Sequence, residues 1–166
     1  MSVLGKLPGD YVAGFVDGEG CFYLTYRSDT RHNRPGSPKY FRWTPYFAIL
    51  LREDDLPILE EIRNSLDCGR IYHMNGGQVS YAIQNLNDLY EKVVPFFTEN
   101  RLRAKKRIDF ELWCQALRIV YKNKENKRSC SLEDNQRLAF LRQKMKEHKA
   151  IGTKEYKNNP SVSVKL

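Results

Sequence analysis

Alternating apolar and polar positions dominate the first half of this chain and predict four β-strands. The alternating runs cover residues 22–27, 40–51, 69–74 and 78–84. Asn75, Gly76 and Gly77 separate the last two runs and suit a tight turn, because these residue types tolerate positive φ. Pro45 interrupts the second run, which indicates an edge position or a bulge. The pattern therefore predicts two β-hairpins.

Apolar spacings of three and four predict helices in the remaining segments. They are expected near residues 11–17, 52–67, 87–97, 102–120 and 132–148. Asp54 and Asp55 suit the start of the second helix, and Pro57 fits its first turn. The element order is helix, strand, strand, helix, strand, strand, helices. This order predicts an α+β sandwich, in which helices cover one face of a four-stranded antiparallel sheet.

The length of 166 residues is that of one domain with a sizeable core. We expect this core over residues 1–121. Residues 122–151 are expected to form a charged linker and a C-terminal helix, and residues 152–166 a flexible tail.

The strand face turned away from the helices is predicted to be polar, basic and free of carboxylates. It collects Tyr23, Thr25, Arg27, Arg42, Thr44, Arg70, Tyr72, Gln78 and Ser80. The predicted loop of residues 28–38 adds Arg31, His32 and Arg34. Each of these residues, taken alone, could simply face solvent on a strand. Four strands that share this composition favour contacts with phosphates and base edges in a groove wide enough for β-ribbons.

The charge balance points to a polyanionic partner, because 28 Lys and Arg face 20 Asp and Glu, a formal net charge of +8. No apolar stretch approaches the roughly 18 residues of a membrane span, so we expect a soluble intracellular protein without a membrane partner. The four cysteines, Cys21, Cys68, Cys114 and Cys130, lack metal-ligand spacing. They are expected to be buried, reduced thiols.

The most distinctive motif is YVAGFVDGEG at residues 11–20. Its apolar residues have helical spacing, and the small residues Ala13 and Gly14 would let a second backbone approach closely. Asp17 and Glu19 follow where glycines end the helix. Carboxylates, and the carbonyl of Gly18 between them, are ligands that Mg²⁺ accepts. The dipeptides Asp-Gly and Glu-Gly are also common where a helix simply ends, with no metal bound.

The complete decapeptide resembles the LAGLIDADG motif of the homing endonuclease and maturase family. The predicted αββαββα order also resembles the core of that family, over about residues 7–120. The second half contains no further AGFxDGEG repeat, so the resemblance implies a homodimer of single-motif chains. The motif helices would pack at the dimer interface through Tyr11, Ala13, Gly14 and Asp17. Each saddle-shaped sheet would enter the major groove of one half of a nearly palindromic double-stranded DNA site.

The activity that the resemblance implies is that of an intron-encoded homing endonuclease, which hydrolyses DNA phosphodiester bonds with Mg²⁺ or Mn²⁺. Glu19 matches the metal-binding acid of the family, with the Gly18 carbonyl as a neighbouring ligand. Lys105 best matches a lysine near the scissile phosphate. Arg103 and Lys106 are its neighbouring candidates and are expected to contact DNA.

One departure from the family pattern affects the expected activity. Leu51 and Asp55 stand where many single-motif members carry a glutamine and a basic residue, which favours a slow or degenerate enzyme. The alternatives are an intron RNA maturase and a DNA-binding regulator, each with weak or lost cleavage. Retention of Glu19 favours catalysis. A protein of this kind would act in the bacterial cytoplasm or in a mitochondrion or chloroplast.

Overall fold

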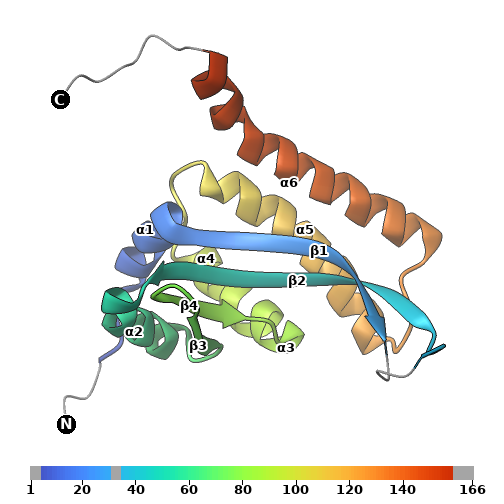
Figure 1. The fold of residues 1–166 in the computed structure, drawn as a ribbon, viewed down its shortest axis with the longest axis horizontal. Helices are drawn as coiled ribbons and strands as arrows, with labels where there is room; N and C mark the ends of the chain where they lie inside the picture. Colours follow the sequence, from blue (N-terminus) through green and yellow to red (C-terminus); the bar gives the residue numbers. More distant parts are fainter. Residues whose placement is uncertain (1–4, 31–34, 159–166) are drawn as a thin grey trace.

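The computed structural model describes residues 5–30 and 35–158 and shows helices packed on one face of an antiparallel sheet (Figure 1). In chain order the elements are α1 (Gly9–Glu19), β1 (Gly20–Thr30), β2 (Lys39–Arg52), the 3-10 turn η1 (Glu53–Asp55), α2 (Leu56–Leu66), β3 (Arg70–Met74), β4 (Gln78–Ile83), α3 (Leu86–Asp88), the π-helical turn η2 (Leu89–Val93), α4 (Val94–Glu99), α5 (Lys106–Glu125) and α6 (Leu132–Asn158). The predicted α+β fold is confirmed.

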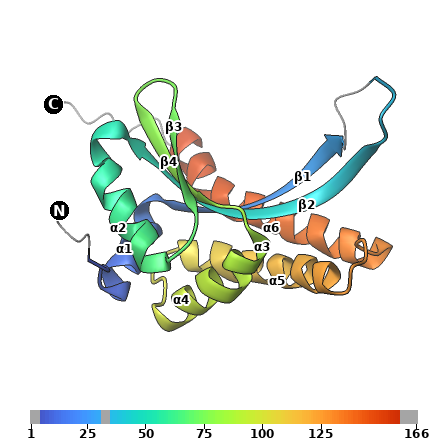
Figure 2. The same cartoon turned by 90° about the horizontal axis from the view of Figure 1, so that it is seen from below.

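The sheet has the strand order β1-β2-β4-β3 and is strongly curved. Figure 2 shows the two hairpins rising on opposite sides of a concave face, with α4 and α5 beneath the sheet. The structure also explains how Pro45 fits β2, which lies between two other strands. Within β2, the segment that pairs with β4 runs from Phe47 to Arg52, so among the described strands Pro45 has a neighbour on one side alone, in β1. It therefore occupies a local edge, as predicted.

Aromatic side chains form the centre of the core between the sheet and the helices. The ring centroid of Phe22 in β1 lies 5.2 Å from those of Phe47 and Phe110 and 5.1 Å from that of Trp113. Phe22, Phe47 and Trp113 are fully buried. Burial of such large side chains stabilises the fold mainly through the removal of apolar surface from water.

The C-terminal half differs from prediction in its boundaries. α5 continues to Glu125, so residues 122–125 are helical instead of part of a linker. The backbone of α6 continues to Asn158, beyond the expected start of a tail at residue 152, and residues 159–166 lie outside the described part. α6 begins with a capping box, in which Ser131 and Asp134 each accept a backbone N–H from the other.

The same helix packs into the main core. Leu138, Leu141 and Met145 join the core cluster. At one end of α6, Asn135 accepts the indole N–H of Trp43 at 2.9 Å. Towards the other end, Nδ1 of His148 lies 2.9 Å from the largely buried carboxylate of Asp109 in α5. α6 therefore contacts β2 near one of its ends and α5 towards the other.

We predict that Leu141→Ala lowers the free energy of unfolding by about 2–5 kcal/mol, because it removes a buried side chain and leaves a cavity. The adjacent Phe140 is 49% exposed, so Phe140→Ala should cost less than about 1 kcal/mol. Denaturant unfolding of the two variants measures this difference. Equal effects would show that α6 does not pack into the core.

Candidate nucleic-acid interface and carboxylate site

The junction between α1 and β1 contains no loop, since Glu19 ends the helix and Gly20 begins the strand. A Cβ atom on Gly20 would lie 2.6 Å from Cγ1 and 2.9 Å from the carbonyl oxygen of Val16. No side chain fits at that separation. Glycine therefore lets the chain change from helix to strand within a single residue.

Glu19 and Gly18 are both exposed at this junction. Among the described residues Glu19 has no hydrogen bond or ion pair, and the space around the Cα of Gly18 is open. A free carboxylate beside an accessible backbone suits a hard divalent cation. The described residues contain no group of three or more His, Cys, Asp or Glu that could hold a metal ion. Glu19 could thus supply only part of a coordination shell.

Helix α1 divides into a buried side and an exposed side. Val12, Ala13 and Val16 are buried in the core, so the prediction that Ala13 lies on an interface surface is wrong. Its small size serves packing within the chain. Tyr11 and Gly14 are exposed, and nothing lies within 4 Å of a Cβ placed on Gly14.

Asp17 makes its contacts within the same chain. Its Oδ2 accepts the backbone N–H of Arg103 at 2.7 Å and that of Ala104 at 3.2 Å. Its Oδ1 is buried and has no hydrogen-bond partner in the described part of the chain. The structure therefore joins Asp17 to the segment that leads into α5. No contact with a second chain is needed to explain its position.

The basic segment before α5 faces solvent. Arg103 and Lys105 are exposed, and Lys106 is half-buried as the first residue of α5. Through Asp17 this segment lies beside the end of α1, so the structure brings the regions of Glu19 and Lys105 to the same end of the sheet. The choice among the three basic residues stays a prediction.

The strand register places every described member of the predicted strand-face set on the concave face. Tyr23 lies opposite Tyr46, Thr25 opposite Thr44, and Arg27 opposite Arg42 in the β1–β2 pair. In the second hairpin Tyr72 pairs with Ser80, Arg70 with Ala82, and Met74 with Gln78. Leu50 and Arg52 of β2 pair with Ser80 and Gln78, which joins the two hairpins into one surface.

Some of the predicted contact residues are less accessible than the arginines or lie outside the described part of the chain. The hydroxyl of Thr25 donates to the carbonyl of Thr44, and the hydroxyl of Thr44 is itself buried without a partner among the described residues. These threonines are therefore less available than the arginines. Arg31, His32 and Arg34 lie outside the described residues.

Two cations contact a stacked pair of aromatic rings in the β1–β2 part of the concave face. The rings of Tyr23 and Tyr46 stack with centroids 4.5 Å apart. The guanidinium of Arg27 lies 5.5 Å from the Tyr46 ring, and Nζ of Lys149 in α6 lies 5.3 Å from the Tyr23 ring. Such cation–π contacts hold charged groups in place at a surface. A hydrogen bond with the Cys21 side chain and, second, burial raise the pKa of the Tyr23 phenol above its ordinary value.

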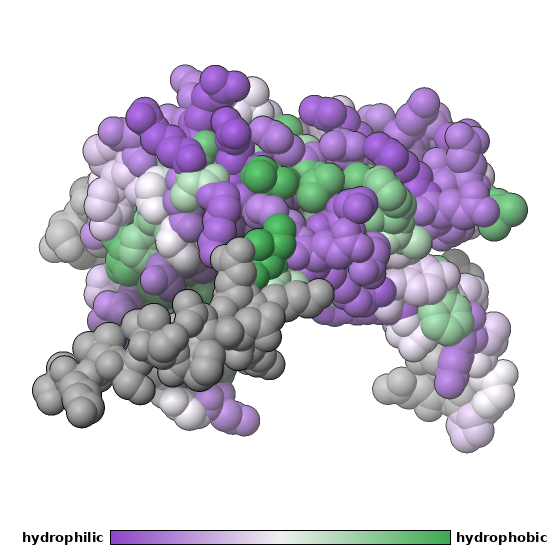
Figure 3. Space-filling view, turned by 90° about the horizontal axis from the view of Figure 1, so that it is seen from above, coloured by the Kyte–Doolittle hydropathy of each residue, from purple (hydrophilic) through white to green (hydrophobic). Residues whose placement is uncertain are grey.

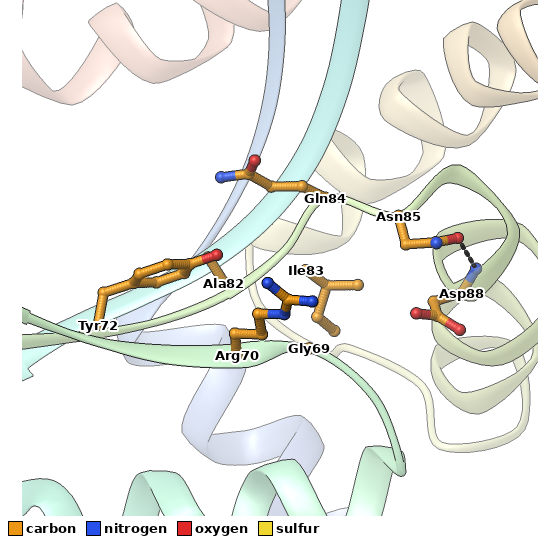
Figure 4. A pocket seen from close by; sticks show the side chains of 8 residues that line it. All are labelled: Gly69, Arg70, Tyr72, Ala82, Ile83, Gln84, Asn85 and Asp88. Carbon is orange, nitrogen blue, oxygen red and sulfur yellow. Dashed lines mark hydrogen bonds between the residues drawn. The ribbon is translucent and has the colours of Figure 1, made fainter.

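A recess of about 300 Å³ lies beside the β3–β4 hairpin. Figure 4 shows the guanidinium of Arg70 and the ring of Tyr72 on one side of it and the amide of Gln84 on the other. Ala82, small and opposite Arg70, forms part of the floor. Arginine and glutamine are the side chains that most often read guanine and adenine by paired hydrogen bonds.

Sequence reasoning missed several residues of this surface. They are Leu50, Arg52, Gln84 and Lys149. A strict period of two along β2 and β4 could have identified the first three, since outward positions alternate. It also shows that Leu50, and not Leu51, points outward at the end of β2. No sequence pattern could have identified Lys149, because its position on this surface depends on how α6 packs.

The four cysteines are free thiols, but only Cys114 is buried. Burial raises the pKa of Cys114 to about 12 and that of Cys68 to about 11. The other three are partly exposed, so the prediction that all four are buried is wrong in this respect. None of the helices that the structure describes is both long and apolar enough to cross a membrane.

Residues 12–117 match the family model described as LAGLIDADG endonuclease. A probable intron-encoded DNA endonuclease 1 from Mycosarcoma maydis is 35% identical over 98 residues, which cover 59% of this chain and 33% of the relative. The chain thus spans about a third of the length of that relative, and about a quarter of the length of a Neurospora crassa relative.

Solved structures agree with the sequence match. The homing endonuclease I-TnaI has a TM-score of 0.70 and 25% identity, and the match covers 87% of this chain and 97% of that chain. The structure of I-SmaMI bound to uncleaved DNA with calcium ions also has a TM-score of 0.70, with 22% identity over 82% of this chain and 44% of that chain, and it supports the fold. The family model covers most of the described core, and the relatives and structures agree with it. The chain therefore belongs to the LAGLIDADG endonuclease family.

Proposed function

We propose that this chain is a site-specific DNA endonuclease, encoded within an intron, that cuts both strands of a long, nearly palindromic duplex. The observation that carries this proposal is the exposed Glu19 carboxylate, which has no partner among the described residues and lies beside a concave, basic sheet face. The relative from Mycosarcoma maydis, named as an intron-encoded DNA endonuclease, supports the substrate class. Figure 3, seen from the side of α6, shows a largely hydrophilic surface whose outline is hollowed beside the projecting β1–β2 hairpin.

The chemistry follows from the groups at the end of α1. Mg²⁺ or Mn²⁺ held by the Glu19 carboxylate and the Gly18 carbonyl would supply Lewis-acid activation of phosphate and water. The DNA phosphates would complete the coordination shell. Lys105 would offset the negative charge that grows on the phosphate during bond cleavage. The arginines of the concave face would bind and orient the duplex.

The active form that we propose is a homodimer. The exposed side of α1 combines Tyr11 with the open surface at Gly14 and Gly18, where another backbone could approach closely. A second copy of α1 packed there would bring two Glu19 carboxylates together. Each would then serve one DNA strand, and the symmetry of the dimer would match a nearly palindromic site.

We predict that Glu19→Gln abolishes DNA cleavage, because it removes the ligand charge with little change in shape. Cleavage selection from a randomised DNA library with Mg²⁺ provides the substrate. The wild type should recover one long site, and the variant should bind that site with unchanged affinity.

A reaction without metal is the control. Full cleavage by the variant would contradict the role of Glu19. Specific binding of duplex DNA without cleavage by the wild type would favour a regulator, and preferential binding of intron RNA would favour a maturase.

Arg70→Ala should weaken binding of the selected duplex by about fivefold to 150-fold, since a paired contact to a base is worth about 1–3 kcal/mol. Arg118→Ala is the matched control, because Arg118 is equally charged and exposed but lies on α5 in a groove between the helices. Fluorescence anisotropy at fixed salt measures both affinities. Equal losses would indicate that only net charge matters.

Gly14→Leu should convert the dimer to monomer through overpacking at the helix crossing. The isolated chain should still fold, because a Cβ at Gly14 meets nothing within 4 Å. Ala139→Leu at an exposed position of α6 controls for the added side chain. Sedimentation measures the mass of each variant, and an unchanged dimer in Gly14→Leu would place the interface elsewhere.

A further inference from the structure

One carboxylate connects the two halves of the candidate site. Oδ2 of Asp17 accepts two consecutive backbone N–H groups, from Arg103 at 2.7 Å and from Ala104 at 3.2 Å. Asp17 precedes Glu19 by two residues, and Ala104 directly precedes Lys105. The contact therefore links the helix that carries the proposed metal ligand to the segment that carries the proposed lysine.

Basic side chains are concentrated before and at the start of α5, although Asp109 lies in its first turn. Lys105 is its N-cap residue and makes no side-chain capping hydrogen bond. The positive end of the helix dipole adds to the charges of Arg103, Lys105, Lys106 and Arg107, so these groups repel one another. Asp17 lies on another helix, α1, and its carboxylate accepts two backbone N–H groups of this basic segment. It thereby offsets part of the repulsion and fixes the path of the backbone.

The second oxygen of Asp17 shows that this arrangement has a cost. Oδ1 is buried, and it has no hydrogen-bond partner among the residues that the structure describes. A buried carboxylate oxygen without a partner destabilises the fold. Because one oxygen of Asp17 bonds two N–H groups while the other has no partner among the described residues, its contact with the basic segment is the interaction that explains its position.

We propose that Asp17 is a positioning residue, which holds Lys105 at a defined place relative to Glu19. This inference rests on the proposed endonuclease function. Asp17 itself need not touch DNA or metal. Its effect on the reaction would pass through the backbone of residues 103–105, so it should disappear when Lys105 is absent.

The first test is a double-mutant cycle with Asp17→Ala and Lys105→Met in single-turnover cleavage with Mg²⁺. Asp17→Ala should slow cleavage by about tenfold to a hundredfold, because small misplacement of a catalytic group has effects of this size. Its dissociation constant for the duplex should change less than about threefold. The double variant should be no slower than Lys105→Met alone. Rate losses that multiply would overturn the proposal.

Two further variants separate positioning from folding. Asp17→Asn keeps an acceptor oxygen for the two N–H groups and should recover part of the lost rate. Asp10→Ala is the matched control on the same helix, since Asp10 is exposed and, among the described residues, its carboxylate accepts a hydrogen bond from the N–H of Tyr11 alone. It should leave the cleavage rate unchanged. A loss as large as that of Asp17→Ala would overturn the assignment.

Amide hydrogen exchange provides a readout that does not depend on cleavage. The N–H groups of Arg103 and Ala104 should exchange faster in Asp17→Ala than in the wild type, while those in the middle of α5 stay protected. Unchanged exchange at both residues would overturn the anchoring role even in an active enzyme. If exchange is faster in Asp17→Ala but the wild type cuts no DNA, the anchoring role is retained and the endonuclease function is rejected.

Discussion

The close approach of Gly20 to Val16 is the constraint on which the rest of the site depends. Because a Cβ at Gly20 would lie 2.6 Å from Val16, only glycine allows α1 to pass directly into β1. That turn leaves Glu19 at the surface and sends Phe22 into the core, while Tyr23 points to the concave face. One backbone junction thus sets the position of the carboxylate relative to both the core and the proposed DNA surface.

Helices α5 and α6 hold the edge strand that follows this junction. The indole N–H of Trp113 donates to the carbonyl of Tyr23 at 3.0 Å, and Nζ of Lys149 donates to the carbonyl of Phe22 at 2.9 Å. These contacts satisfy backbone acceptors that an edge strand would otherwise leave open to water or to another chain. They also place an ammonium group near the start of β1. The C-terminal helix therefore shapes the same surface that the strands present.

Much of this arrangement could be predicted from local sequence. The period of two identified the concave face, and the decapeptide identified the exposed acid at the end of α1. Three features required tertiary structure. Ala13 is small because it packs in the core, Asp17 reaches Arg103 across 86 positions of sequence, and Lys149 reaches β1 only after α6 docks. Periodicity describes one element at a time, so contacts between distant elements are beyond its reach.

The central claim is that Glu19 from each of two chains holds a divalent ion beside a DNA phosphate. The most direct measurement is a crystal structure of the protein bound to its selected duplex with Mn²⁺, with anomalous scattering used to locate the metal. We predict a metal peak about 2.1 Å from a Glu19 carboxylate oxygen of each chain, with a phosphate oxygen in the same shell. Metal bound only elsewhere, or Glu19 turned away from the DNA, would contradict this account.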